Sequence, residues 1–255
     1  YPDLRIFRIT GGEPLLSAET FKALDYIAEH PHRDLEVIIN SNLCVPDGLI
    51  TKLIEKARII LDKKNVKSFT VFSSLDTHGE QAEYIRTGLS YERIMKNANR
   101  ILEEVPESKV GFTVTYNALT LQRFILLLQE LKKMREKYHN NKNRTRVLFD
   151  TPYLRFPDHL SIKTVPREFS NYFDEQIAYV EKNINDINGF TELELMKLHR
   201  VREWMLTPNE QAWVDKSRRD FKIYFTEHDK RRNTNFVKTF PEFAEFYNSL
   251  TLQES

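Results

Sequence analysis

The stretch "LRIFRITGGEPLL", residues 4–16, decides the fold. Apolar and polar side chains alternate from Leu4 to Ile9, which is typical of a strand. Gly11 and Gly12 then allow backbone conformations that other residues avoid, and they let a ligand approach the main chain closely. Pro14 restricts the following turn and opens the way to a helix. We therefore expect a strand, a tight glycine turn and a helix within the first 30 residues.

The same rhythm recurs along the first 150 residues. Helical periodicity separates four further apolar runs, at Leu35–Asn40, Ser68–Ser74, Val110–Tyr116 and Val147–Asp150. Ser17 and Ser90 stand where helix N-caps are expected. Strands that alternate with helices predict an α/β fold whose sheet is parallel and built of βα units.

The rhythm changes after Asp150. Thr151–Pro166 contains three prolines and reads as a long connection, and the rest is helical in pattern. The expected helices are Arg167–Asn185, Thr191–Met205, Asn209–Glu227 and Pro241–Leu250. We therefore divide the chain into a βα core, residues 1–165, and an α-helical C-terminal extension, residues 166–255.

Composition narrows the classes of protein. Cys44 is the single cysteine. The chain therefore cannot form an internal disulfide, and it cannot supply more than one cysteine ligand to a metal. We expect its thiol to serve packing. The cysteine count favours a cytoplasmic setting. No apolar run approaches the roughly 20 residues of a membrane span, so we expect no membrane partner.

Charge gives little support to a nucleic-acid partner. The net charge of +1 is close to neutral. Two segments are locally basic, Lys132–Arg146 and Ser217–Arg232. We interpret both as solvated faces, the first including a surface loop, with a contact to RNA or an acidic peptide as the less favoured alternative.

Polar residues follow the predicted strands. They are Asn40-Ser41-Asn42, Ser73-Ser74-Leu75-Asp76, Thr115-Tyr116-Asn117 and Asp150-Thr151. Each alone is typical of a turn or cap, and for Asp76 we favour a cap role over acid–base chemistry. The carboxyl ends of parallel strands meet at one edge, so together they predict a ligand site there. The carboxylate of Glu13, beside bare glycine carbonyls, suits an ammonium group.

On these residues the sequence resembles the radical S-adenosylmethionine enzymes, in particular the twitch-domain type. The motifs are Thr10–Leu16, Asn40–Leu43 and Ser74-Leu75-Asp76. Further similar segments are Glu83–Gly88, Tyr91–Ile94, Leu160–Ile162 with Pro166, Asn233–Phe236 and Thr239–Pro241. The resemblance covers nearly the whole chain.

The resemblance implies a partial (β/α)6 TIM-like barrel whose first strand and cluster loop lie upstream of Tyr1. It implies two cofactors, S-adenosylmethionine and a [4Fe–4S] cluster that cleaves it reductively to a 5′-deoxyadenosyl radical. That radical would abstract hydrogen from a peptide, a sugar nucleotide or another metabolite. An electron donor such as flavodoxin or ferredoxin is implied as a partner.

The resemblance also implies roles for individual residues of these motifs. Gly11, Gly12, Glu13 and Pro14 would bind the methionine amino group, and Ser41 and Asn42 would line the ligand. Leu43 replaces a glycine of the family pattern. Ser74 would lie near the methionine carboxylate or ribose, with Asp76 beside it. Arg86 would pair with the carboxylate, and Asn117 would face the ribose or adenine.

The three cluster cysteines of the family, spaced Cys-x3-Cys-x2-Cys, are absent from this chain. We expect them upstream of Tyr1, so the polypeptide alone would be inactive. One alternative is a non-catalytic binding module that kept the S-adenosylmethionine pocket. Another is an unrelated βα-barrel enzyme that uses Gly11 and Gly12 for an anionic ligand.

Overall fold

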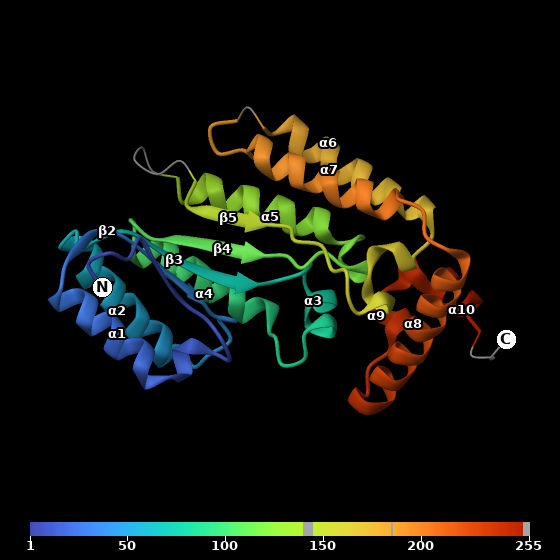
Figure 1. Ribbon diagram of the computed structural model, residues 1–255, viewed down its shortest axis with the longest axis horizontal. Helices are drawn as coiled ribbons and strands as arrows, with labels where there is room; N and C mark the ends of the chain where they lie inside the picture. The colour runs from blue at the N-terminus through green and yellow to red at the C-terminus, as the bar shows by residue number, and fades with distance from the viewer. Residues whose placement is uncertain (140–144, 185, 252–255) are drawn as a thin grey trace. The chain divides into compact units, whose positions relative to one another are not determined.

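The computed structural model describes residues 1–139, 145–184 and 186–251 (Figure 1). Internal contacts divide the chain into two compact units, each built from separate segments. Unit 1 comprises Tyr1–Leu75, Leu89–Thr113 and Leu131–Asp150. Unit 2 comprises Asp76–Gly88, Val114–Glu130 and Thr151–Ser255. The division therefore falls at several points within the βα part of the chain.

Unit 1 contains a five-stranded parallel sheet, which confirms the predicted α/β class. Its strands lie in chain order: β1 (Ile6–Ile9), β2 (His32–Asn40), β3 (Val66–Ser74), β4 (Lys109–Thr113) and β5 (Val147–Asp150). Ser74 pairs in register with Thr113, and Thr113 with Asp150. All five carboxyl ends therefore lie at one edge of the sheet (Figure 1).

Amphipathic helices cover this sheet, as the periodicity predicts. α1 (Ala18–Glu29) and α2 (Asp47–Asp62) lie side by side, and α4 (Tyr91–Glu104) contacts β4 (Figure 1). Both predicted N-caps are confirmed: the hydroxyl of Ser17 accepts from the amide of Glu19, and that of Ser90 from the amide of Arg93. The apolar stripes of the three helices are buried.

The prediction of a solvated basic face at Lys132–Arg146 agrees with Lys133 and Lys137, which are exposed, and is wrong for three other basic residues. Lys132 and Arg135, within α5 (Phe124–Lys137), are buried, and so is Arg146. Residues 140–144, where the surface loop was expected, lie outside the described residues. The two arginines are buried because main-chain carbonyls elsewhere in the chain accept their hydrogen bonds: Arg135 donates to the Val147 carbonyl at 2.9 Å.

Arg146 closes the end of α4. Its guanidinium donates to the carbonyl oxygens of Leu102 at 2.7 Å, Val105 at 2.9 Å and Ser108 at 2.9 Å. The last carbonyls of a helix have no partner within the helix. One planar, charged group therefore satisfies a carbonyl of the last turn of α4 together with two carbonyls of the segment that follows it.

Unit 2 is mainly helical. Its helices are α3 (Glu80–Ile85), α6 (Asn171–Lys182), α7 (Glu192–Leu206), α8 (Gln211–Arg232), α9 (Phe236–Thr239) and α10 (Ala244–Ser249). α6, α7, α8 and α10 correspond to the four helices predicted from residue 167 onward, and α6 and α7 lie side by side (Figure 1). The predicted start of the last helix differs in detail, because Pro241 begins a 3-10 turn that α10 then follows.

Aromatic side chains form the core of unit 2. Phe221, Phe225, Phe236, Phe240 and Phe243 are all buried. Tyr84 joins them, and its hydroxyl donates to the carboxylate of Asp229 at 2.8 Å. Burial, reinforced by Asp229, raises the pKa of Tyr84 far above its usual value. Among the described residues no helix combines the length and apolar character needed to cross a membrane.

Replacing Arg146 with methionine would leave buried carbonyls without donors. We expect Arg146→Met to lower the free energy of unfolding by about 3 kcal/mol. Urea denaturation followed by circular dichroism measures the change. Arg93→Met is the matched control, because Arg93 is exposed in the same unit, and we expect it to change stability by less than about 0.5 kcal/mol. Equal midpoints for the two variants would contradict the role of Arg146.

Candidate functional site

The Glu13 carboxylate ties the ends of β1 and β2 together. Its Oε1 accepts from the Ser41 hydroxyl at 2.7 Å and from the Leu15 amide at 3.1 Å. Its Oε2 accepts from the Asn42 amide at 2.7 Å. Glu13 is placed for this because it caps the short 3-10 turn Pro14–Leu16. One acidic side chain thus joins two neighbouring strand ends.

The glycine pair leaves main chain bare beside this carboxylate. Gly11 and Gly12 have φ of +97° and +57°, and a Cβ on either would meet no heavy atom within 4 Å. Their carbonyl oxygens accept no hydrogen bond from any residue that the structure describes. Glycine is thus required here by backbone conformation rather than by crowding. The result is open space next to free acceptors.

The turn after β2 is held internally. The Ser41 hydroxyl, besides donating to Glu13, accepts from the Leu43 amide at 3.0 Å. The Asn42 side-chain oxygen accepts from the Cys44 amide at 2.8 Å. Leu43 has a φ of +55° and is fully buried. The leucine therefore keeps the left-handed backbone that a glycine would have at this position.

Two polar groups at the same edge remain without partners. The hydroxyl of Ser74, at the end of β3, makes no hydrogen bond within the described chain. The side-chain oxygen of Asn40, the last residue of β2, is buried and unpartnered. Asn40 lies in register with Phe72, so it shares the sheet face of Ser74, two residues farther along β3. The sequence placed Asn40 among the strand-end residues that together predict a ligand site, although the resemblance assigned it no separate role.

Unit 2 brings together the other three predicted residues. Asp76 accepts from Arg86 through both oxygens, at 2.8 and 3.1 Å, and from the Thr115 amide at 2.9 Å. Asn117 donates to the Thr115 carbonyl at 2.9 Å. The Asp76 side chain is only 4% exposed. Asp76 therefore anchors the segment, which agrees with the cap-like role favoured for it over acid–base chemistry.

Arg86 and Asn117 are largely committed to these contacts. Arg86 uses Nε and Nη2 for Asp76 and retains Nη1, and its side chain is 35% exposed. The Asn117 side-chain oxygen accepts from the Leu119 amide, and Thr120 completes a capping box. Asn117 is buried, so its amide serves mainly this turn.

Metal-binding groups are sparse in the described chain. Cys44 is a half-buried thiol whose sulfur accepts from the Ser90 amide at 3.3 Å, which agrees with its expected packing role. Nowhere in residues 1–139, 145–184 and 186–251 do three or more His, Cys, Asp or Glu side chains gather to hold a metal ion. The residues present therefore do not fit an iron–sulfur cluster.

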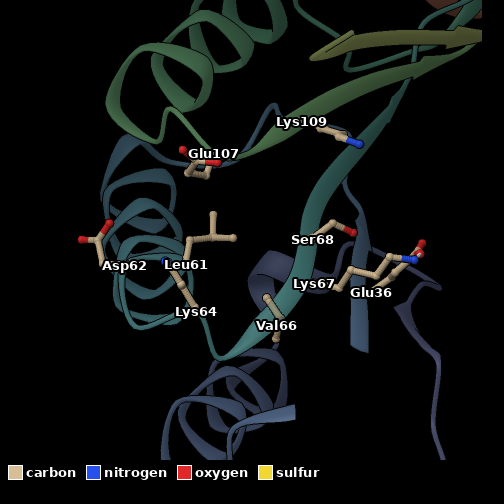
Figure 2. A pocket seen from close by; sticks show the side chains of 9 residues that line it. All are labelled: Glu36, Leu61, Asp62, Lys64, Val66, Lys67, Ser68, Glu107 and Lys109. Carbon is tan, nitrogen blue, oxygen red and sulfur yellow. Dashed lines mark hydrogen bonds and ion pairs between the residues drawn. The ribbon is translucent and has the colours of Figure 1, made fainter. Parts of the chain in front are cut away.

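Two cavities of unit 1 lie at different parts of the sheet. The larger, of about 600 Å³, lies at the amino ends of β3 and β4, where Lys109 and Ser68 line it and Lys67 pairs with Glu36 (Figure 2). It contains none of the predicted site residues. The smaller, of about 350 Å³, is lined by residues of β1, the glycine turn and the start of α1: Phe7, Ile9, Thr10, Gly11, Pro14, Ser17, Glu19, Thr20 and Ala23. Of the two, only the smaller contains predicted site residues, Gly11 and Pro14, and Glu13 lines neither.

Comparison of the chain with protein-family models, with curated proteins and with solved structures finds no match.

Gly12 and Gly48 should respond in opposite ways to alanine. We expect Gly12→Ala to destabilise the protein by about 1 kcal/mol, because alanine disfavours positive φ. Gly48→Ala, in the first turn of α2 with open space around it, should stabilise by about 0.5–1 kcal/mol. Thermal melts of the two variants test this. A stabilising Gly12→Ala would show that the turn does not need its observed conformation.

Proposed function

We propose that this chain is the S-adenosylmethionine-binding core of a radical S-adenosylmethionine enzyme with a partial (β/α)6 barrel. The observation that carries the proposal is the set of acceptors at the end of β1. The Gly11 and Gly12 carbonyls stand free of described partners beside the Glu13 carboxylate, at the carboxyl edge of a parallel sheet. The motif resemblance points to the same residues.

This set matches an ammonium group. A carboxylate offers about four lone-pair sites. Three donors already use Glu13, so about one site remains on Oε2. Together with the two glycine carbonyls it provides three acceptors and one negative charge, which suits the three N–H bonds of the methionine amino group. Ser74 and Asn40 offer polar atoms without described partners for the rest of the amino-acid end.

The iron–sulfur cluster has no set of ligands in this chain. A [4Fe–4S] cluster would supply the electron for reductive cleavage of bound S-adenosylmethionine. With one cysteine, this chain holds S-adenosylmethionine in the proposal but supplies no cluster site among its described residues. The cysteines would come from outside these 255 residues. The roles predicted for Arg86, Asp76 and Asn117, the electron donor and the substrate all stay predictions.

The same observation favours a second candidate, a non-catalytic module that binds S-adenosylmethionine. It needs no cluster, and it uses the same acceptors at Gly11, Gly12 and Glu13. Iron and sulfide analysis of a longer parent protein, reconstituted anaerobically, separates the two. Bound iron and sulfide support the enzyme, and their absence supports the module.

Calorimetric titration tests the site itself. We expect S-adenosylmethionine to bind at least about tenfold more tightly than 5′-methylthioadenosine, which lacks the amino-acid end. Glu13→Gln should reduce this preference to about twofold or less, because the charge facing the ammonium is lost. Glu29→Gln, an exposed change at the end of α1, is the matched control and should preserve the preference.

The wild-type comparison keeps the test independent of any folding defect in Glu13→Gln. Equal affinity of the wild type for both ligands would refute an amino-acid subsite at Glu13. Binding of inorganic phosphate in place of S-adenosylmethionine would favour the alternative of a βα enzyme for an anionic ligand.

A further inference from the structure

A separate cavity lies along α8 in unit 2. Its volume is about 450 Å³, within the range of roughly 300–1,000 Å³ that small-molecule sites occupy. The lining side chains Asp220, Tyr224, Glu227 and Arg231 recur at helical spacing and so form one stripe of α8. His159, from the 3-10 turn Asp158–Leu160, completes the wall.

The floor of this cavity is aromatic and accessible. The His159 and Tyr224 rings lie 4.7 Å apart between centroids. Tyr224 is 43% exposed and Ile223 is 44% exposed, whereas Phe221 and Phe225 on the same helix are buried. The aromatic core of unit 2 therefore leaves much of Tyr224 and Ile223 uncovered. A flat apolar ring could stack on this surface.

One polar atom of the cavity wall lacks a partner. Nε2 of His159 is buried and has no hydrogen bond within the described chain. Burial lowers the pKa of His159, and the positive charge of Lys216 lowers it further. The carboxylates of Asp220 and Asp158 oppose this shift. The ring is therefore neutral at pH 7, and Nε2 can donate or accept a hydrogen bond.

The cavity is lined by two carboxylates and by two arginines, which lie at one end of it. Its two carboxylates are paired with lysines: Asp220 with Lys216 at 2.7 Å and Glu227 with Lys230 at 2.8 Å. Arg231 reaches Glu227 only at 3.9 Å. Arg232 has no ion pair with any described residue. Positive charge therefore remains available at the end of α8.

Not every basic residue of Ser217–Arg232 contributes to this surface. Arg218 donates to the Thr164 carbonyl, and Lys222 donates to the Tyr247 carbonyl. Some basic side chains of the segment are thus used in internal hydrogen bonds, whereas Arg231 and Arg232 form a short cationic end. Side chains of a helix lean toward its N-terminus, so the two arginines lean toward Tyr224.

We propose that this cavity binds a nucleoside monophosphate unit. The base stacks on Tyr224 beside the His159 ring, and the phosphate pairs with Arg231 and Arg232. Arginine suits this because its planar fork matches phosphate oxygens. A free nucleotide and the 5′ end of a nucleic acid share this chemistry. The site uses residues different from those of the proposed S-adenosylmethionine site, so either proposal can fail alone.

Calorimetric titration of the full chain with four probes tests the proposal: AMP, adenosine, inorganic phosphate and a 5′-phosphorylated tetranucleotide. We expect AMP to bind at least about tenfold more tightly than adenosine or phosphate. The double variant Arg231→Gln/Arg232→Gln should lose about tenfold in AMP affinity, and His159→Ala, which removes the ring beside the base, about threefold. Arg219→Gln is the matched control, because Arg219 lies on the same helix and does not line the cavity.

Absence of AMP binding at about 1 mM, or the same loss in Arg219→Gln as in the double variant, overturns the proposal. Displacement of AMP by S-adenosylmethionine overturns it as well, because one shared site would then explain both ligands. Tighter binding of the tetranucleotide, with the same losses in the variants, supports the site and assigns it to a nucleic-acid end. Tighter binding of AMP assigns it to a free nucleotide.

Discussion

The parallel ladder of unit 1 is the constraint on which the site depends. Five strands that pair in chain order all run in the same direction, so their carboxyl ends share one edge. The connection between two parallel strands must then cross back over the sheet, and here a helix makes it. The apolar stripes of these helices pack on the sheet and bury it. The turns after β1 and after β2 are far apart in the sequence, and the pairing of the two strands is enough to make them neighbours.

Glu13 converts that proximity into a rigid arrangement. Its carboxylate accepts two donors from the turn after β2 and one from its own turn. A charge held in this way needs little further ordering when a ligand arrives. The free acceptors beside it belong to Gly11 and Gly12, whose positions the backbone conformation sets. Glu13 therefore joins the two turns through their donors, and the glycine carbonyls lie outside its hydrogen bonds.

Local sequence patterns predicted the helices and strands well. They could not predict hydrogen bonds between residues that are far apart in the sequence. Alternation, 3.6-residue periodicity and the serine caps located the strands and the main helices because these signals act within a few residues. The burial of Arg146 depends on carbonyls about 40 positions earlier, and the left-handed Leu43 runs against its own preference. Composition alone made Lys132–Arg146 look like a solvated face. The two discontinuous units have no local signature either.

Hydrogen-bond partners separate the polar residues that shape the fold from those that await a ligand. Asp76 and Asn117 resemble site residues in sequence, yet their polar atoms already bond to Arg86, Thr115 and Leu119. Asn40 and His159 have the opposite character, since each buries a polar atom that no described residue satisfies. Buried polar groups without partners are uncommon in folded proteins, because desolvation is then uncompensated. The described chain buries thirteen such atoms, most of them outside both sites, so an unpartnered atom points to binding only where a motif or a cavity lies beside it.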